Sequence, residues 1–498
     1  MPTNGTSAQD LRTWIELLRR EGELIDVKAQ VDPFLEITEI VDRTIRTGGP
    51  ALLFHHPRKS AHPLLINQFG TERRMCLAFG EPNLDAVARK LHEMTSLQPP
   101  QNFSEQMRGM GKLRRLLDTQ PQLVSKGPCQ ELVLEPNLDL LPIQHCWPDD
   151  PAPFITLPAV ITKNPRTGER NLGMYRMQKI DAQTTFMHWQ IHKDGATDWR
   201  GMSERLDVAV ALGCDPITTY LATVPFPRNV DELVIAGYLR GAPLELVKAK
   251  TVDLEVPASA EIILEGYITR GELGIEGPFG DHTGYYSAAE PFPVFHLTCM
   301  TMRRDAIYPS IIVGLPPAED AWLGKTTERL FLPMLRMSMP EVVDYDLPVA
   351  GAFQHCAIVS VKKAYPGHAK KVIHAIWGMG LLSLIKSVVV VDEFINVHNY
   401  EQVFFQVCAN VDPKRDILLS EGPLDQLDHS AVLYCYGGKL GIDATHKWTS
   451  EGVREWPKRI EMSAEVRNLV DQRWDEYGIG AAAGQDELPP DGIRRGLF

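Results

Sequence analysis

A long central stretch of the chain, from about Glu131 to Arg304, consists of short apolar runs separated by proline and glycine turns. Phe154 to Ile161 and Val208 to Leu212 are typical of these runs. Turn signals at this frequency favour short strands, and strands spaced in this way form sandwiches or barrels. We therefore expect a β-sandwich or β-barrel in the middle of the chain.

On both sides of this stretch, helix alternates with strand. Asp10 is a good N-cap for a helix that Gly22 ends, and a strand and a second helix (residues 35–45) follow. Beyond the centre, Pro366 opens another helix. The β-branched run from Ser387 to Val391 is typical of a buried parallel strand.

The length of 498 residues suggests about three domains. We expect an N-terminal α/β domain (1–115), a central β domain (116–315), a C-terminal α/β domain (316–460), and a final helix with a tail (461–498). The fold class is therefore α/β and α+β, multidomain.

The formal charge of −13, without a Lys/Arg-rich block, argues against nucleic-acid binding. The most apolar stretch, Leu381 to Val391, is interrupted by Lys386 and is too short to span a bilayer. The N-terminus lacks the apolar core of a signal peptide, and the eight cysteines are scattered. We expect a cytoplasmic protein with reduced thiols and no transmembrane segment.

The strongest chemical signal is the loop of residues 274–286, GIEGPFGDHTGYY. Its two carboxylates, Glu276 and Asp281, flank a Gly-Pro-Phe-Gly turn. Neighbouring carboxylates can push their pKa values apart, and the protonated one can act as a general acid. A solvated glycine-rich turn is an equally good interpretation of this pattern.

Four further residues carry weaker signals. Arg176 lies on an expected strand, where an edge arginine with a solvated tip is the simpler interpretation. His188 and His192 share one face of another expected strand (Thr185 to Ile191) and could bind a metal ion, although a polar face is more common. Glu232 opens a helix, where it compensates the helix dipole. These patterns indicate at most an enzyme that uses carboxylates and an arginine.

Together these segments resemble the UbiD family of decarboxylases, which use prenylated FMN. The resemblance extends from about Asp10 to Trp474, and its most similar branch is the 4-hydroxy-3-polyprenylbenzoate decarboxylase of ubiquinone synthesis. The segments that carry it are 31–40, 171–176, 256–266, 276–286, 367–370 and 441–445. It implies a central split β-barrel of the flavin-reductase type, a C-terminal oligomerisation domain, and a homo-oligomer between a dimer and a hexamer.

The resemblance also implies roles for individual residues. Asn171, His192 and Glu232 would hold a divalent ion, Mn²⁺ or Mg²⁺, against the cofactor phosphate, with K⁺ as a further candidate. Arg176, Glu276 and Asp281 would form the catalytic network, in which Arg176 steers the substrate carboxylate and Asp281 protonates the carbon after CO₂ leaves. The residues expected to line the prenylated flavin are Met174, Tyr175, Arg176, His188, Trp189, Gln190, Lys193 and Asp194. Because a free aspartic acid has a pKa of about 4, the acid role requires surroundings that raise it, and Glu276 is the expected source of negative charge.

The implied reaction is the non-oxidative decarboxylation of a polyprenylated 4-hydroxybenzoate, with a flavin prenyltransferase as cofactor supplier and peripheral contact with the inner membrane. The chain departs from this branch at His188, Lys193-Asp194, Leu315 and residues 428–434, all in segments expected to line the pocket. The alternatives are therefore a decarboxylase or reversible carboxylase of another aromatic, heteroaromatic or naphthoic acid, a flavin-binding protein without turnover, and, as a weaker option, a metal-dependent hydrolase.

Overall fold

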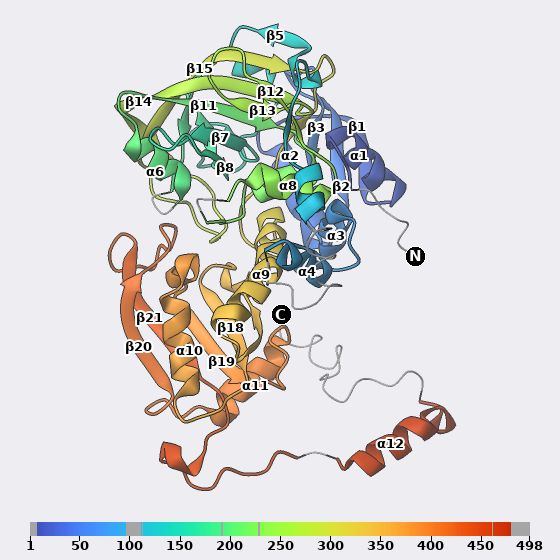
Figure 1. Ribbon diagram of the computed structural model, residues 1–498, viewed down its shortest axis with the longest axis vertical. Coiled ribbons are helices and arrows are strands. Elements are labelled where there is room, and N and C mark those ends of the chain that lie inside the picture. The colour runs from blue at the N-terminus through green and yellow to red at the C-terminus, as the bar shows by residue number, and fades with distance from the viewer. Residues whose placement is uncertain are drawn as a thin grey trace. The chain divides into compact units, whose positions relative to one another are not determined.

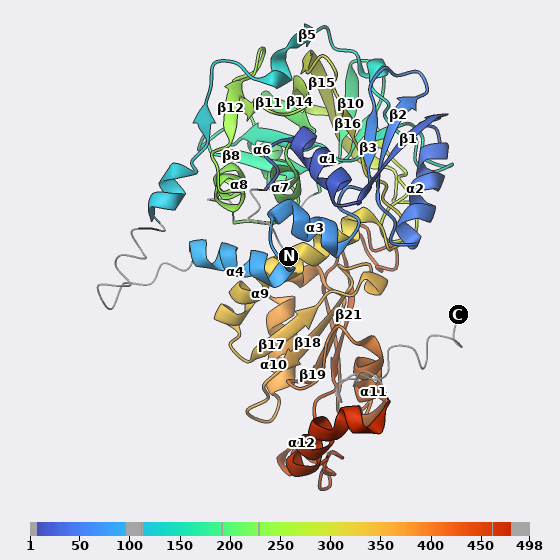
Figure 2. The ribbon, with the colours of Figure 1, turned by 90° about the vertical axis from the view of Figure 1, so that its right-hand side faces the viewer.

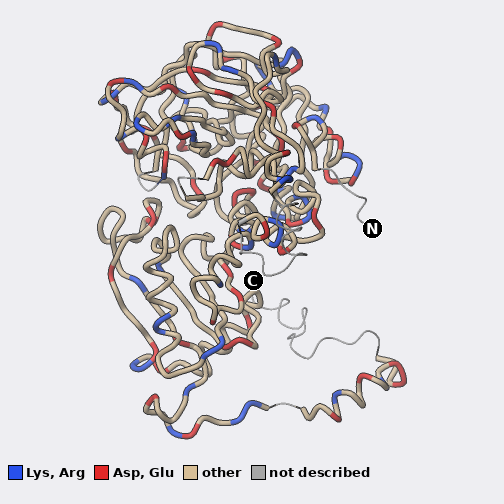
Figure 3. The backbone as a smooth tube through the Cα atoms, in the orientation of Figure 1, with Lys and Arg blue, Asp and Glu red and all other residues tan. Residues whose placement is uncertain are grey.

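The computed structural model describes residues 7–95, 111, 113–190, 193–227, 230–460 and 462–479. The chain forms two compact units (Figures 1 and 2). The first unit comprises Met1–Met337, Val349–His355 and Leu424–Tyr436, and the second comprises Ser338–Pro348, Cys356–Pro423 and Gly437–Phe498. Acidic and basic residues are interspersed along the described parts of both units (Figure 3).

The N-terminal part of the first unit is a small α/β layer, as expected. Asp10 caps the first helix by accepting the Thr13 N–H at 2.8 Å, and Trp14 and Leu18 are buried on its inner face. Strand β1 pairs in parallel with β2, and β16 joins the same sheet from a distant part of the chain. The elements are α1 (Leu11–Arg20), β1 (Leu24–Val31), α2 (Glu36–Arg46), β2 (Ala51–Pro57), β3 (Leu64–Ile66), α3 (Glu72–Phe79), α4 (Leu84–Thr95) and β16 (Tyr308–Pro309).

The centre of the first unit is an antiparallel sheet of nine strands in the order β6-β9-β10-β15-β14-β11-β7-β8, with β5 beside β15. Its strands are β5 (Leu132–Leu134), β6 (Phe154–Ile155), β7 (Ala159–Lys163), β8 (Arg170–Met174), β9 (Met177–Lys179), β10 (Thr184–Met187), β11 (Arg205–Leu212), β14 (Ile262–Glu276) and β15 (Glu290–Met302). The expectation of uniformly short strands is wrong for β14 and β15, which form one long hairpin. A register shift between Ile268 and Leu273 lets their pairing continue as far as Glu276.

Helices pack beside this sheet and position side chains at its edge. Leu233 of α8 and Leu172 of β8 belong to the same buried apolar cluster, which fixes the first turn of α8 against the sheet. The remaining elements of the first unit are β4 (Gln122–Leu123), α6 (Asp194–Gly201), α7 (Pro216–Leu221), α8 (Glu232–Arg240), β12 (Glu245–Lys248), β13 (Glu255–Pro257) and α9 (Glu319–Ser338), whose last residue belongs to the second unit.

The second unit is a mixed five-stranded sheet in the order β17-β18-β19-β21-β20. Strand β19 pairs in parallel with both neighbours and its valines are largely buried, which confirms the buried parallel strand expected at 387–391. Its elements are β17 (Val342–Asp346), β18 (Cys356–Val361), α10 (His368–Trp377), β19 (Ser387–Asp392), α11 (Tyr400–Asn410), β20 (Ile417–Pro423), β21 (Tyr436–Asp443) and α12 (Ala464–Arg473).

Short 3₁₀ turns occupy Pro128–Gln130, Leu138–Leu140, Val349–Gly351, Gly380–Leu384, Thr449–Glu451 and Trp474–Tyr477. Ser463 caps α12, and none of the side chains of that helix is buried. Among the residues that the structure describes, no helix combines the length and the apolar character that a membrane span requires.

Candidate active site

Arg176 lies at the centre of a buried ion-pair network, between the end of β8 and the start of β9. Its Nε and Nη2 atoms donate to the two carboxylate oxygens of Glu276 at 2.7 and 3.0 Å. Its Nη1 atom donates to Oδ2 of Asp281. The side chains of Arg176, Glu276 and Asp281 are only 10%, 0% and 6% exposed. The fold thus brings together the three residues that were predicted to be catalytic.

The glycine-rich loop holds the two carboxylates in place. Glu276 is the last residue of β14, and Asp281 follows in the turn. Gly277 has a φ of +88°, a conformation that a residue with a side chain adopts only under strain. Phe279 lies beneath the guanidinium, with its ring centroid 4.5 Å from the Arg176 Cζ atom. Because both carboxylates are buried, the alternative interpretation of this loop as a solvated glycine-rich turn is wrong.

Positive charge determines the protonation of both carboxylates. Burial raises the pKa of Glu276, but the charge of Arg176 and hydrogen bonds from His188 and Arg176 outweigh burial and lower it to about 2. Burial also raises the pKa of Asp281, but His282 and Arg176 together bring it well below the usual range. The anionic surroundings expected for Asp281 are therefore wrong: Arg176 and His282 flank its carboxylate and favour the ionised form.

His188 contacts the same network. Its Nδ1 atom lies 3.2 Å from Oε2 of Glu276, and its ring packs against Phe292 at a centroid distance of 4.2 Å. Burial and the charge of Arg176 lower the pKa of His188, which favours the neutral imidazole.

The expectation that His188 and His192 lie on one strand is wrong for His188. Strand β10 ends at Met187. The His188 N–H donates to the Arg176 carbonyl at 3.1 Å, in register with the pairing of Met187 and Met177, and the chain turns at Trp189, whose N–H donates to the Met187 carbonyl at 2.9 Å. His192 lies outside the described residues.

Three further predicted residues, Asn171, Asp194 and Glu232, line a small open hollow at the edge of the sheet. The residues that line it are Asn164, Glu169, Arg170, Asn171, Asp194, Asp198 and Glu232. Glu232 is the first residue of α8 and is buried, with its carboxylate accepting the Leu172 N–H at 3.2 Å. Burial raises its pKa to about 8. Amide and carboxylate oxygens gathered in one hollow fit a hard divalent cation, so this donor set can hold the implied metal.

Some of the residues expected to line the flavin lie around the start of α6, where Asp194 lines this hollow. The Tyr175 hydroxyl accepts the Gly195 N–H at 3.1 Å, and Lys193 Nζ lies 5.9 Å from the Tyr175 ring centroid. Trp189 is 1% exposed. A Cβ atom at residue 195 would lie 2.7 Å from Nε1 of Trp189, so the backbone approaches these rings closely. Met174 is the last residue of β8, and Asp194 is the first residue of α6.

Two contacts of the site were not predicted. His282 places Nδ1 2.9 Å from Oδ1 of Asp281. The residue is part of the loop motif, but no role was predicted for it. Gln190 donates to Oδ2 of Asp425 at 3.1 Å. These two residues are 235 positions apart, and no spacing pattern could have paired them.

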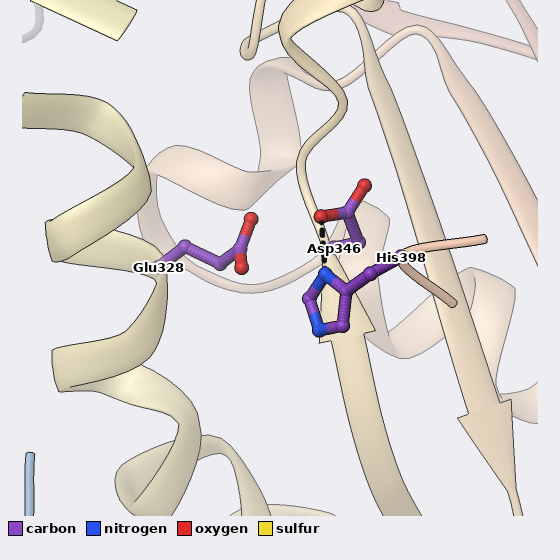
Figure 4. A group of neighbouring side chains, drawn as sticks. All are labelled: Glu328, Asp346 and His398. Carbon is purple, nitrogen blue, oxygen red and sulfur yellow. Dashed lines mark hydrogen bonds and ion pairs between the residues drawn. The ribbon is translucent and has the colours of Figure 1, made fainter. Parts of the chain in front are cut away.

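The second unit contains another histidine–aspartate cluster that the sequence analysis did not single out. His398 places Nδ1 2.8 Å from Oδ1 of Asp346, as Figure 4 shows, and Nε2 3.0 Å from Oδ2 of Asp344. These bonds fasten the segment before α11 to the end of β17.

Three family models match successive parts of the chain between residues 15 and 444. They are the N-terminal domain (residues 15–94), the Rift-related domain (122–316) and the C-terminal domain (321–444) of 3-octaprenyl-4-hydroxybenzoate carboxy-lyase, the UbiD protein. An uncharacterized protein of Archaeoglobus fulgidus is 52% identical over 474 residues, which cover 94% of this chain and 98% of that protein. An uncharacterized protein of Aquifex aeolicus is 46% identical over 484 residues, which cover 95% of this chain and 100% of that protein.

Solved structures agree with the family models. The vanillic acid decarboxylase of Sedimentibacter hydroxybenzoicus in its closed form gives a TM-score of 0.84 at 26% identity, covering 94% of this chain and 99% of that one. The UbiD-class enzyme HmfF of Pelotomaculum thermopropionicum, in complex with FMN, gives 0.76 at 29% identity, covering 93% and 99%. An evolved dimeric form of HmfF, in complex with prenylated FMN, gives 0.73 at 29% identity, covering 92% and 98%.

Proposed function

Because the chain belongs to the UbiD family of carboxy-lyases, we propose that it decarboxylates an aromatic acid with prenylated FMN and a divalent metal ion. The observation that carries this proposal is the buried network of Arg176, Glu276 and Asp281. It combines one cation that can receive a substrate carboxylate with one carboxyl group that can deliver a proton. Both are needed when CO₂ is exchanged for hydrogen.

Loss of CO₂ from an sp² carbon leaves an electron pair that no side chain of this network can accept, and prenylated FMN, when bound, supplies the electron sink. The protein's own residues bind, orient and move a proton. Arg176 presents a rigid fork of donors that suits a carboxylate, and Glu276 fixes its plane through two hydrogen bonds. Asp281, on the other side of the guanidinium, is placed to protonate the carbon that CO₂ leaves.

The oxygen-lined hollow supports the metal assignment. Asn171 and Glu232, with His192, would hold Mn²⁺ or Mg²⁺ against the cofactor phosphate, and K⁺ remains a further candidate. The residues that would line the flavin are Met174, Tyr175, Arg176, His188, Trp189, Gln190, Lys193 and Asp194. In this proposal the nine-stranded sheet is a flavin-reductase-like split barrel, and the second unit serves oligomerisation.

The first candidate substrate is 4-hydroxy-3-polyprenylbenzoate, which the enzyme would meet at the inner membrane surface. The enzyme would be a homo-oligomer, and a flavin prenyltransferase would supply its cofactor. A small phenolic acid is the second candidate, favoured by the likeness to a vanillic acid decarboxylase over nearly the whole chain. The departures at His188 and Leu315 from the polyprenylbenzoate branch also favour it. Naphthoic and heteroaromatic acids, in either reaction direction, are further alternatives.

A substrate screen tests the proposal. The protein is co-expressed with a flavin prenyltransferase and incubated with a polyprenylated 4-hydroxybenzoate, vanillate, 3,4-dihydroxybenzoate, a naphthoate and a heteroaromatic acid. We expect CO₂ release in step with loss of one acid, and no release by Asp281→Asn protein carrying the same cofactor. Cofactor-loaded protein that releases CO₂ from none of them would instead be a flavin-binding protein without turnover.

A further inference from the structure

Asp281 requires a source of protons. Replacing the carboxylate of a substrate by hydrogen consumes one proton in each turnover. The acid that protonates the carbon must therefore be reprotonated before the next turnover. Asp281 is 5% exposed, and Arg176 contacts its Oδ2 atom. A proton donor within the protein can therefore reach Asp281 at its other oxygen, Oδ1.

His282 occupies this position. Its Nδ1 atom lies 2.9 Å from Oδ1 of Asp281, and its backbone N–H donates to the same oxygen at 2.8 Å. The ring packs against Phe353 at a centroid distance of 5.0 Å, which limits its rotation. The residue is 5% exposed, and among the described residues its buried Nε2 atom has no hydrogen-bond partner.

Two further carboxylates interact with His282 through their charge. They belong to Asp320, near the start of α9, and Asp425, which follows β20. Burial lowers the pKa of His282, but its hydrogen bond to Asp281 and the charges of Asp281, Asp320 and Asp425 outweigh burial and raise it. Burial, reinforced by Asp281, raises the pKa of Asp320 to about 6. The neighbouring carboxylates thus shift His282 toward its imidazolium form.

We infer that His282 is a positioning residue that reprotonates Asp281 and so supplies the proton used in decarboxylation. This inference rests on the proposed function. The Nδ1–H bond breaks as an Oδ1–H bond forms on Asp281, which leaves a neutral imidazole with its proton on Nε2. The Oδ1–H bond then breaks as a C–H bond forms at the carbon that lost CO₂. The imidazole regains one proton from solvent, so that each turnover consumes one proton and needs no oxidant or reductant.

Substrate binding favours the first of these transfers. A carboxylate that arrives at Arg176 brings negative charge close to Asp281 and competes for the guanidinium that holds it ionised. A neighbouring anion raises the proton affinity of a carboxyl group. Substrate binding therefore draws a proton held by His282 toward Asp281.

The variant His282→Asn separates this role from a structural one, because its amide can still donate to Oδ1 but holds no transferable proton. We expect kcat to fall about 100-fold, the lower end of general acid–base effects. The cofactor spectrum and the KM of the substrate should be retained. The decline of wild-type activity with rising pH, as His282 loses its proton, should disappear from the variant's profile.

Two further variants provide a control and a second test. His446 makes the same type of contact in the second unit, with Nδ1 2.6 Å from Oδ1 of Asp392, so His446→Asn makes the same exchange there and should leave kcat unchanged. Asp320→Asn removes an anion that faces His282 and should move the decline of activity to lower pH.

A measurement on the cofactor-free protein reports the proton directly. Because folding raises the pKa of His282, its stabilisation is present below the unfolded value of about 6.5 and is lost as pH rises through the folded value. The melting temperature of the wild type should therefore exceed that of His282→Asn most at low pH.

The outcomes separate the two claims. Wild-type release of CO₂ with unchanged kcat and pH profile in both His282→Asn and Asp320→Asn would overturn the proton transfer alone. A wild type that releases CO₂ from no acid would overturn the proposed function and the transfer with it.

Discussion

Replacing Arg176 by methionine should destabilise the cofactor-free protein in a pH-dependent way. The change leaves Glu276 and Asp281 buried, at 0% and 6% side-chain exposure, without the guanidinium that both contact. In the wild type the pKa of Glu276 is lowered from 4.5 to about 2, mainly by Arg176 acting against burial. At about 1.4 kcal/mol per pKa unit, this lowering is worth about 3 kcal/mol. This value agrees with the general cost of removing one partner from a buried ion pair, which is about 3–5 kcal/mol.

The sign of the pH dependence follows from the same carboxylates. The wild-type contribution of Glu276 is fully present above pH 4.5 and is lost as pH falls through about 2. In Arg176→Met, burial without the guanidinium raises the pKa of Glu276, so the variant is least stable at neutral pH and recovers as the carboxyl group takes up a proton. The difference from wild type should therefore be largest near pH 7.5 and smaller near pH 5.

Urea unfolding followed by tryptophan fluorescence at both pH values measures this difference. The matched control is Arg176→Met combined with Glu276→Gln and Asp281→Asn, which removes both buried charges and should regain much of the lost stability. A loss below about 1 kcal/mol at pH 7.5, or a triple variant no more stable than the single one, would refute the reasoning.

Four other substitutions have specific expected outcomes. Asp281→Asn should retain the cofactor spectrum and lower kcat at least about 100-fold, and an unchanged rate would exclude Asp281 as the acid. Asn171→Ala and Glu232→Gln should each lose metal and flavin together, as measured by elemental analysis and visible absorbance, whereas retention of both would refute the metal assignment. Trp14→Ala, at a fully buried position of α1, should lower the free energy of unfolding by about 3–5 kcal/mol, and a loss near zero would show that α1 does not depend on this contact.

The sequence predicted those parts of the fold that local patterns determine. Asp10 caps α1 through its own side chain, and the valines of β19 form a buried parallel strand because β-branched residues suit that position. The strand expected from Thr185 to Ile191 ends early, at Met187, because the Trp189 N–H bonds to the Met187 carbonyl and turns the chain there. The domain boundaries remain a prediction.

The candidate site depended more strongly on long-range contacts. Glu276 and Asp281 stood out because both lie in one short loop. Arg176, 100 residues away from Glu276, could be joined to them only through the family resemblance. The electrostatics could not be predicted, because adjacent carboxylates suggest mutual repulsion, whereas the fold surrounds Asp281 with Arg176 and His282. The contact of Gln190 with Asp425 has no local signal at all.

The most direct test of the central claim is the mass of the cofactor released from protein that has been co-expressed with a flavin prenyltransferase and supplied with Mn²⁺. The account predicts the mass of FMN carrying one fused prenyl-derived ring. Metal-replete protein that releases no flavin of any kind would contradict it.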